Sequence, residues 1–177
     1  KYNIPMGLGF GLTGQPNTGH DVGGFWGPVP SPELLVRWVQ NGIFHPRFSI
    51  HSWRLDGSAT EPWTYPEVID IIREAIRFRY RLIPYLYSLY VHASEPGAPI
   101  VRPLVYHFPE DPLATEESFT FLLGEGLLIA SVFGEGLRER DVYLPAGAAW
   151  CDVHTGVWME GGAQAVLPAP LERATLV

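Results

Sequence analysis

Residues 18–27 read TGHDVGGFWG, and this stretch points to both a fold and a site. It places one carboxylate, Asp21, and two large aromatic side chains, Phe25 and Trp26, among four glycines. Glycine has no Cβ, so it allows another molecule to approach the backbone closely, and it also suits a simple turn.

The residues on either side of this stretch favour an α/β unit. We expect a short strand over residues 15–22, a turn at Gly23 and Gly24, and then a helix. A polar residue at such a strand end faces the open edge of the sheet, where ligands bind. An Asp beside an aromatic wall suits a sugar, which has hydroxyl edges and apolar faces. The alternative, an Asp that only caps the backbone of its own turn, stays open.

Two helices are expected in the first half of the chain. Ser31, Pro32 and Glu33 form a typical helix start, and apolar residues follow at helical spacing until Gly42. A longer helix is predicted to begin at residues 66–67 and to end near residue 93. Pro84 lies within it, so a kink is expected near Tyr80.

The segments outside these helices are of two kinds. Residues 45–64 form a long polar and aromatic connection, of a length that is often functional. After Gly97 the chain consists of short β-rich segments separated by Gly, Pro or acidic turns. This pattern predicts a small all-β module, a sandwich, with a boundary at residues 94–99.

Composition excludes several classes of partner and site. The net charge is −7 and no basic patch is evident, so no nucleic-acid partner is expected. No apolar run reaches the length of a membrane span, so no membrane partner is expected either. Cys151 is the single cysteine, which rules out an internal disulfide and favours a small buried residue. A zinc site built from His20, Asp21, His45 and His51 is conceivable, but their spacing does not support one, and neither metal nor cofactor is expected.

Six motifs in order carry a family resemblance: GHDVGGF, ELLVRWVQNGIFHPRFSIHS, EPW, RYRLIPYLY, GAPIVRPL and VYLPAGAAWCDVHTG. Together they resemble glycoside hydrolase family 31, the family of α-glucosidases, α-xylosidases and their relatives. The resemblance implies an α/β part followed by an all-β part, in a fragment of a longer chain. Residues 1–95 would be the last third of a (β/α)8 TIM barrel, and residues 96–177 an incomplete antiparallel β-sandwich. It also implies a helix over residues 4–12, although three glycines there oppose helix formation.

The resemblance also assigns site residues. Asp21 matches the Asp of G-x-D-x-x-G-F that binds hydroxyls of the sugar next to the cleaved bond. Phe25 matches the aromatic wall of that subsite, and Trp26 is placed at its rim. His51 matches the family's His that hydrogen-bonds the same sugar, usually written R-x-H, although Ser49 stands where that pattern has Arg. Arg37 and the Trp after it match a structural R-W pair.

The catalytic carboxylates are expected elsewhere. A retaining glycosidase needs a nucleophile and an acid/base roughly 5–5.5 Å apart. Neither family motif for these residues occurs in this sequence, and both would lie upstream. We therefore expect an oligosaccharide or α-glucoside substrate, a need for the remainder of the barrel, and no activity in the isolated chain. The alternatives are an α-xylosidase or transglycosylase of the same family, or a non-catalytic sugar-binding module.

Overall fold

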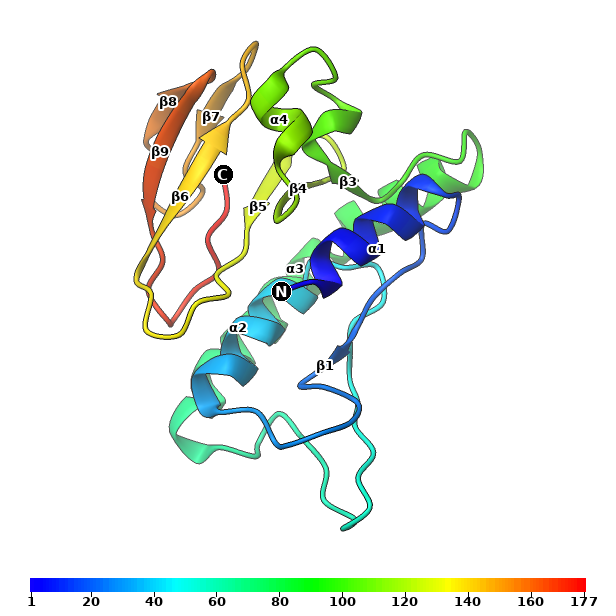
Figure 1. Cartoon of the computed structure of the whole chain (residues 1–177), viewed down its shortest axis with the longest axis vertical. Coiled ribbons are helices and arrows are strands. Elements are labelled where there is room, and N and C mark those ends of the chain that lie inside the picture. Colours follow the sequence, from blue (N-terminus) through cyan, green and yellow to red (C-terminus); the bar gives the residue numbers. More distant parts are fainter.

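A computed structural model describes residues 1–177, with helices gathered in the first half and strands in the second (Figure 1). The first half contains α1 (Asn3–Leu12), β1 (Asp21–Val22), α2 (Pro32–Gly42), β2 (Ser49–Ile50), the 3-10 turn η1 (Pro66–Val68) and α3 (Ile69–Ser94). The second half contains β3 (Val101–Pro103), the 3-10 turn η2 (Leu104–Tyr106), α4 (Pro112–Glu116), β4 (Thr120–Leu123), β5 (Leu127–Ala130), β6 (Glu139–Leu144), β7 (Ala149–Cys151), β8 (Trp158–Glu160) and β9 (Ala163–Pro168). No helix is both long enough and apolar enough to span a bilayer.

Helix α1 forms despite its glycines. Gly7 and Gly11 lie on its buried side. A Cβ on Gly7 would lie 3.2 Å from the ring of His20, and one on Gly11 would lie 3.3 Å from the carbonyl oxygen of Val101. The glycines therefore allow α1 to pack closely, and this packing outweighs their low helix propensity.

Helix α2 confirms the predicted start and end. The backbone N–H of Leu34 donates to Ser31 Oγ at 3.3 Å, and Pro32 occupies the first turn. The helix ends at Gly42, where a Cβ would lie only 2.7 Å from the side chain of Val22. Its apolar face is buried against α3 and β1, which fixes the position of the β1 edge.

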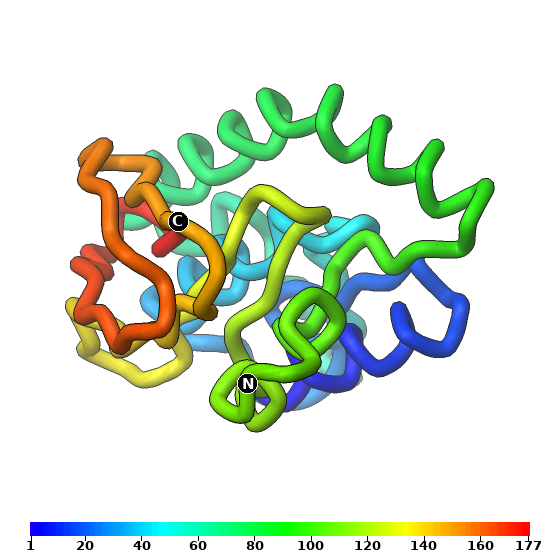
Figure 2. Tube along the Cα trace, turned by 90° about the horizontal axis from the view of Figure 1, so that it is seen from above, coloured from blue at the N-terminus to red at the C-terminus, as the bar shows by residue number.

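Helix α3 runs without interruption through Pro84. Figure 2 shows α3 curved into one continuous arc, and the helix is unbroken near Tyr80, where a kink was expected. Buried residues on both sides of Pro84, Ile72 before it and Leu86 and Leu89 after it, pack into the same core. This packing holds both halves of the helix against the rest of the molecule.

The strand expected over residues 15–22 is much shorter than predicted. Only Asp21 and Val22 form β1, which pairs in parallel with β2 in the register Asp21 to Ser49. The preceding residues have no regular secondary structure, and the N–H of Gln15 donates to Phe10 O and that of Thr18 to Pro16 O. Those local bonds use the groups that a longer strand would need.

The second half confirms the predicted antiparallel β-structure. Its strands pair as β3-β4-β5, β6-β9 and β7-β8, all antiparallel. The end of the chain adds to β5, because Leu128 and Val177 exchange backbone hydrogen bonds of 2.8 and 2.9 Å. Cys151, expected to be buried, is a free thiol at the half-buried end of β7.

The two halves share one hydrophobic core. Its larger cluster combines residues of α1, α2 and α3 with residues of β3, β4 and β5, among them Val101, Phe121 and Ile129. A second cluster lies wholly within residues 104–177. The helices are thus held by the β3-β4-β5 sheet, which leaves the β1-β2 edge on the opposite side.

Candidate functional site

The residues predicted to bind a ligand lie on two neighbouring segments. Asp21 stands in β1 and His51 directly follows β2, and these two strands lie side by side. Phe25 and Trp26 follow β1 in the loop that leads to α2. The structure therefore brings all four predicted residues to one edge of the molecule.

Asp21 is held by an arginine that follows α2. Arg47 Nη2 donates to Asp21 Oδ1 at 2.8 Å, and this is the only side-chain hydrogen bond of that carboxylate. Both side chains are partly exposed. The second oxygen of Asp21 is therefore free to accept a hydrogen bond from a ligand.

Phe25 and His51 form an aromatic wall next to this carboxylate. Their ring centroids are 5.4 Å apart with an interplanar angle of 39°. The two loops are joined, because the N–H of Trp53 donates to the carbonyl oxygen of Phe25 at 2.7 Å. Both rings are exposed, and no hydrogen bond engages the imidazole of His51.

Trp26 has a partner that the sequence did not reveal. It stacks on Trp53, with ring centroids 5.0 Å apart and an angle of 23° between the planes. Arg54 Nε donates to the carbonyl oxygen of Gly27 at 2.9 Å and fastens the two loops at this point. Trp53 lies two residues after His51, and this closeness in sequence is the signal that could have placed it at the same edge.

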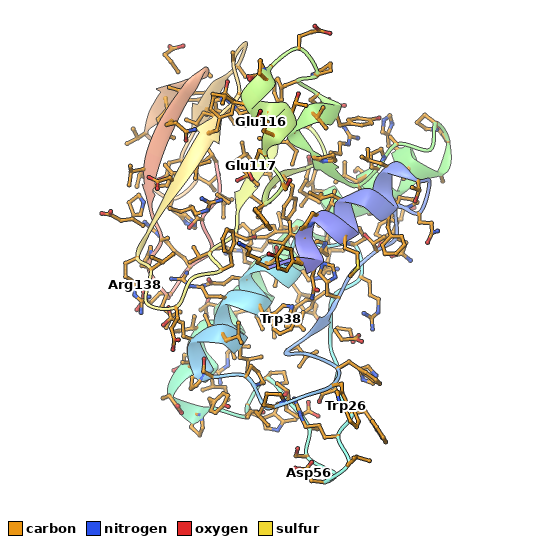
Figure 3. All side chains as sticks on the ribbon, in the orientation of Figure 1. Trp26, Trp38, Asp56, Glu116, Glu117 and Arg138 are labelled. Atoms are coloured by element: carbon orange, nitrogen blue, oxygen red, sulfur yellow. The ribbon has the colours of Figure 1, made fainter.

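A shallow hollow of about 320 Å³ lies beside this pair. It is lined by Trp26, Gly27, Arg54, Leu55 and Asp56. Figure 3 shows Trp26 and Asp56 at the same end of the molecule, far from Glu116 and Glu117 in the second half. Its lining combines the apolar side chains of Trp26 and Leu55 with the charged Arg54 and Asp56, which suits a polar ligand with one apolar face.

Arg79 of α3 fixes the segment that leads into β2. It donates to the carbonyl oxygens of Ile43, His45 and Pro46 at 2.6, 2.7 and 2.7 Å. Burial lowers the pKa of Arg79 from its ordinary value. From the sequence, Arg79 is only one position in the helical pattern of residues 66–93. Its role was not predicted, because its contacts join residues more than thirty positions apart.

Beneath the edge lie two histidines in edge-to-face contact. The rings of His20 and His45 are 4.7 Å apart, and His45 also packs on Phe121 of β4. Burial, with the neighbouring His20 and Arg79, lowers the pKa of His45 to about 3, and burial also lowers that of His20. Both rings are therefore neutral at pH 7.

The conceivable zinc set does not assemble. His51 packs on Phe25, Asp21 pairs with Arg47, and the other two histidines face each other. No group of three His, Cys, Asp or Glu side chains in residues 1–177 is close enough to hold a metal ion.

Arg37 also takes the place expected of it. It is buried and donates across to the second half, to the carbonyl oxygens of Leu137, Ala169 and Pro170 at 3.0, 2.7 and 3.0 Å. This confirms that its role is structural and sets it apart from the exposed edge.

Two family models together cover nearly the whole chain. The one described as "Glycosyl hydrolases family 31 TIM-barrel domain" matches residues 1–89. The one described as "Glycosyl hydrolase family 31 C-terminal domain" matches residues 97–177. The chain belongs to glycosyl hydrolase family 31. The predicted family, the barrel end and the following C-terminal domain are thereby confirmed.

Curated relatives of this family 31 chain are α-glucosidases. It is 41% identical to a probable glucan 1,3-alpha-glucosidase of Arabidopsis thaliana, over 97% of this chain and 19% of that protein. It is also 41% identical to neutral alpha-glucosidase AB of Sus scrofa, over 97% of this chain and 18% of that protein. The chain thus spans about a fifth of the length of these relatives.

Solved structures of family 31 enzymes have the same fold. A Flavobacterium johnsoniae dextranase complexed with glucose matches with a TM-score of 0.92 and 34% identity, over 98% of this chain and 22% of that one. An α-xylosidase from a soil metagenome, complexed with xylose, matches with a TM-score of 0.88 and 34% identity, over 96% of this chain and 28% of that one.

Proposed function

We propose that this chain is the substrate-positioning part of a retaining α-glycosidase that hydrolyses terminal α-linked glucose. The observation that carries the proposal is the convergence of Asp21, Phe25 and His51 on the β1-β2 edge of a family 31 chain. The α-glucosidases among its relatives support glucose as the sugar.

Each residue has a task that suits its chemistry. The free oxygen of Asp21 accepts a hydrogen bond from a sugar hydroxyl, and the exposed imidazole of His51 binds a second hydroxyl. Phe25 covers an apolar face of the ring. Trp26 lies at the rim, where the leaving part of the substrate passes. These contacts orient the substrate, and orientation alone contributes several kcal/mol to a catalysed reaction.

The remaining parts of the reaction belong to a larger assembly. Residues 1–95 would be the last third of a (β/α)8 barrel, and residues 96–177 a β-sandwich that follows it. The break between the two family models, after residue 89 and before residue 97, supports this division. The nucleophile and the acid/base, which would act through a covalent glycosyl-enzyme, come from the rest of the barrel.

Two alternatives remain beside this proposal. The similarity to an α-xylosidase structure favours xylose as the sugar. The absence of both catalytic motifs from these residues is compatible with a non-catalytic sugar-binding module as well as with a catalytic pair in the rest of the barrel. Transfer of the glycosyl group to a second sugar is a variant of the first mechanism, because only the acceptor changes.

The test uses the full-length protein and Asp21→Asn, assayed with an aryl α-glucoside and an aryl α-xyloside. We expect wild-type hydrolysis of the glucoside and a fall of about hundredfold in kcat/KM for Asp21→Asn. Asp70→Asn is the control, because Asp70 is exposed on α3 and pairs only with Arg73.

Three results would contradict the proposal. Preference for the xyloside would establish the xylosidase alternative, and sugar binding without turnover would establish the binding module. Turnover by the isolated 177 residues would refute the assignment of the catalytic pair to the rest of the barrel.

A further inference from the structure

The carboxylate of Asp21 is fixed from one side only. Its Oδ1 accepts from Arg47 Nη2 at 2.8 Å, while Oδ2 has no partner. This charge-assisted hydrogen bond restrains Oδ1 and leaves the lone pairs of Oδ2 available to a ligand. The contact with Arg47 therefore favours orientations of Asp21 in which Oδ2 is the oxygen that accepts from a ligand hydroxyl.

The arginine does not stand where the R-x-H pattern would place it. In the parallel β1-β2 pair, Asp21 is the register partner of Ser49. An arginine two residues before His51 would therefore lie beside Asp21. Ser49 carries no charge, and its hydroxyl takes part in no hydrogen bond. In this chain the cation comes from Arg47, two positions earlier.

The backbone around Arg47 is built to hold it in place. Its N–H donates to the carbonyl oxygen of Thr18 at 3.0 Å. A Cβ on Gly19 would lie 1.9 Å from the carbonyl oxygen of Arg47, so only glycine allows this approach. On the other side, Arg79 binds the carbonyl oxygen of Pro46. The Arg47 backbone is thus fixed between the GHDVGGF segment and α3.

This ion pair has little to offer the stability of the fold. Both partners are partly exposed, and exposed pairs contribute little to unfolding free energy. The contacts that hold the Arg47 backbone are better explained by the orientation of Asp21, because ligand binding needs a defined geometry.

We propose that Arg47 is the positioning residue for Asp21 and replaces the arginine of the R-x-H pattern in this chain. The inference rests on the proposed function, because it gives Asp21 a sugar hydroxyl to bind. It predicts that the location of the positive charge matters for binding, and that Arg47 acts only through Asp21.

The experiment is a double-mutant cycle in the full-length protein, with kcat and KM measured on an aryl α-glucoside. Arg47→Gln is expected to lower kcat/KM about tenfold, while Arg47→Lys retains part of the activity. In the Asp21→Asn background Arg47→Gln should cause no further loss. Moving the charge, by Arg47→Ser with Ser49→Arg, should restore activity to within about threefold of wild type.

The control is Arg77→Gln. Arg77 pairs with Glu74 on the exposed side of α3, so this variant removes a similar ion pair far from the edge. Its kinetics should equal those of wild type. The melting temperature of Arg47→Gln should also stay close to that of wild type, which separates positioning from a structural role.

The outcomes separate this inference from the proposed function. The inference is overturned if Arg47→Gln has full activity. It is also overturned if Arg47→Gln lowers kcat/KM as much in the Asp21→Asn background as in wild type, or if the variant with Arg47→Ser and Ser49→Arg folds but does not regain activity. If the wild type hydrolyses no donor, the proposed function fails. In that case the Kd of 1-deoxynojirimycin, a glucose-shaped amine, is measured for the same variants. We expect the changes in affinity to follow the pattern given above for kcat/KM. Absence of any binding would overturn both.

Discussion

His45 and His51 stand six residues apart and lie in opposite environments. His45 is completely buried and belongs to a region that we call the seam, made of Arg37, Gln40, Asn41, His45 and the second-half residues that they contact. His51 is exposed and belongs to the edge, made of Asp21, Phe25, Trp26, His51 and Trp53.

The two regions differ in how their polar groups are used. In the seam, Asn41 Oδ1 accepts from Ser131 Oγ at 2.8 Å and Gln40 Nε2 donates to the carbonyl oxygen of Leu171 at 2.6 Å. At the edge, by contrast, one oxygen of Asp21 and the ring of His51 have no hydrogen-bond partner. Hydrogen bonds between buried groups hold a fold together, whereas free groups on an exposed edge are available to a ligand.

The largest expected effect concerns the seam and pH. The folded-state pKa of His45 is about 3, below the ordinary 6.5, because burial disfavours its charged form. As pH falls below 6.5 the unfolded chain binds a proton that the folded chain does not. Stability should therefore fall by about 1.4 kcal/mol per pH unit until pH approaches 3. Burial of His20 acts in the same direction.

Urea unfolding of the full-length protein at pH 7 and pH 4 measures this slope. In His45→Gln the contribution of His45 should disappear and the slope should decrease. If the substitution leaves the slope of stability against pH unchanged, protonation of His45 does not cause the loss of stability. The contrast drawn between His45 and His51 would then be wrong.

The next effect concerns Arg37. Arg37→Ala removes the donor for three second-half carbonyl oxygens and leaves a cavity in a buried position. We expect a loss of about 3 kcal/mol in unfolding free energy. Arg138→Ala is the control, because Arg138 makes a half-exposed ion pair with Glu33 and should cost less than about 1 kcal/mol. If the two variants lose similar amounts of unfolding free energy, the distinction between buried and exposed arginines is wrong.

The smallest effect concerns the stacked pair at the edge. Trp53→Ala removes the partner of Trp26 and is expected to lower kcat/KM for an α-linked oligosaccharide about tenfold. With α-glucosyl fluoride, which has no sugar as leaving group, it should change little. Trp63→Ala is the control, since Trp63 is exposed in the same connection but takes no part in the Trp26–Trp53 stack. Equal losses on both substrates would make Trp53 a structural residue.

Local signals predicted the elements that depend on neighbouring residues. The capping Ser31, the proline after it and the glycine at the end of α2 act within a few positions, and the structure confirms all three. The helix over residues 4–12 was expected only from the family resemblance, because its glycines become favourable through packing on His20 and Val101. The strand expected over residues 15–22 is confirmed only at Asp21 and Val22, since local hydrogen bonds use the backbone groups before them.

The sequence by itself determined the family, the succession of a helical first half and a β-rich second half, and four residues of the edge: Asp21, Phe25, Trp26 and His51. These follow from motifs and spacings that are continuous along the chain. The tertiary structure decided which arginine holds Asp21, which tryptophan stacks on Trp26 and how Arg79 fixes the connection. Arg47 is 26 residues from Asp21 and Arg79 is 34 residues from His45. Contacts over such separations form only when the core brings the segments together, so no local pattern encodes them.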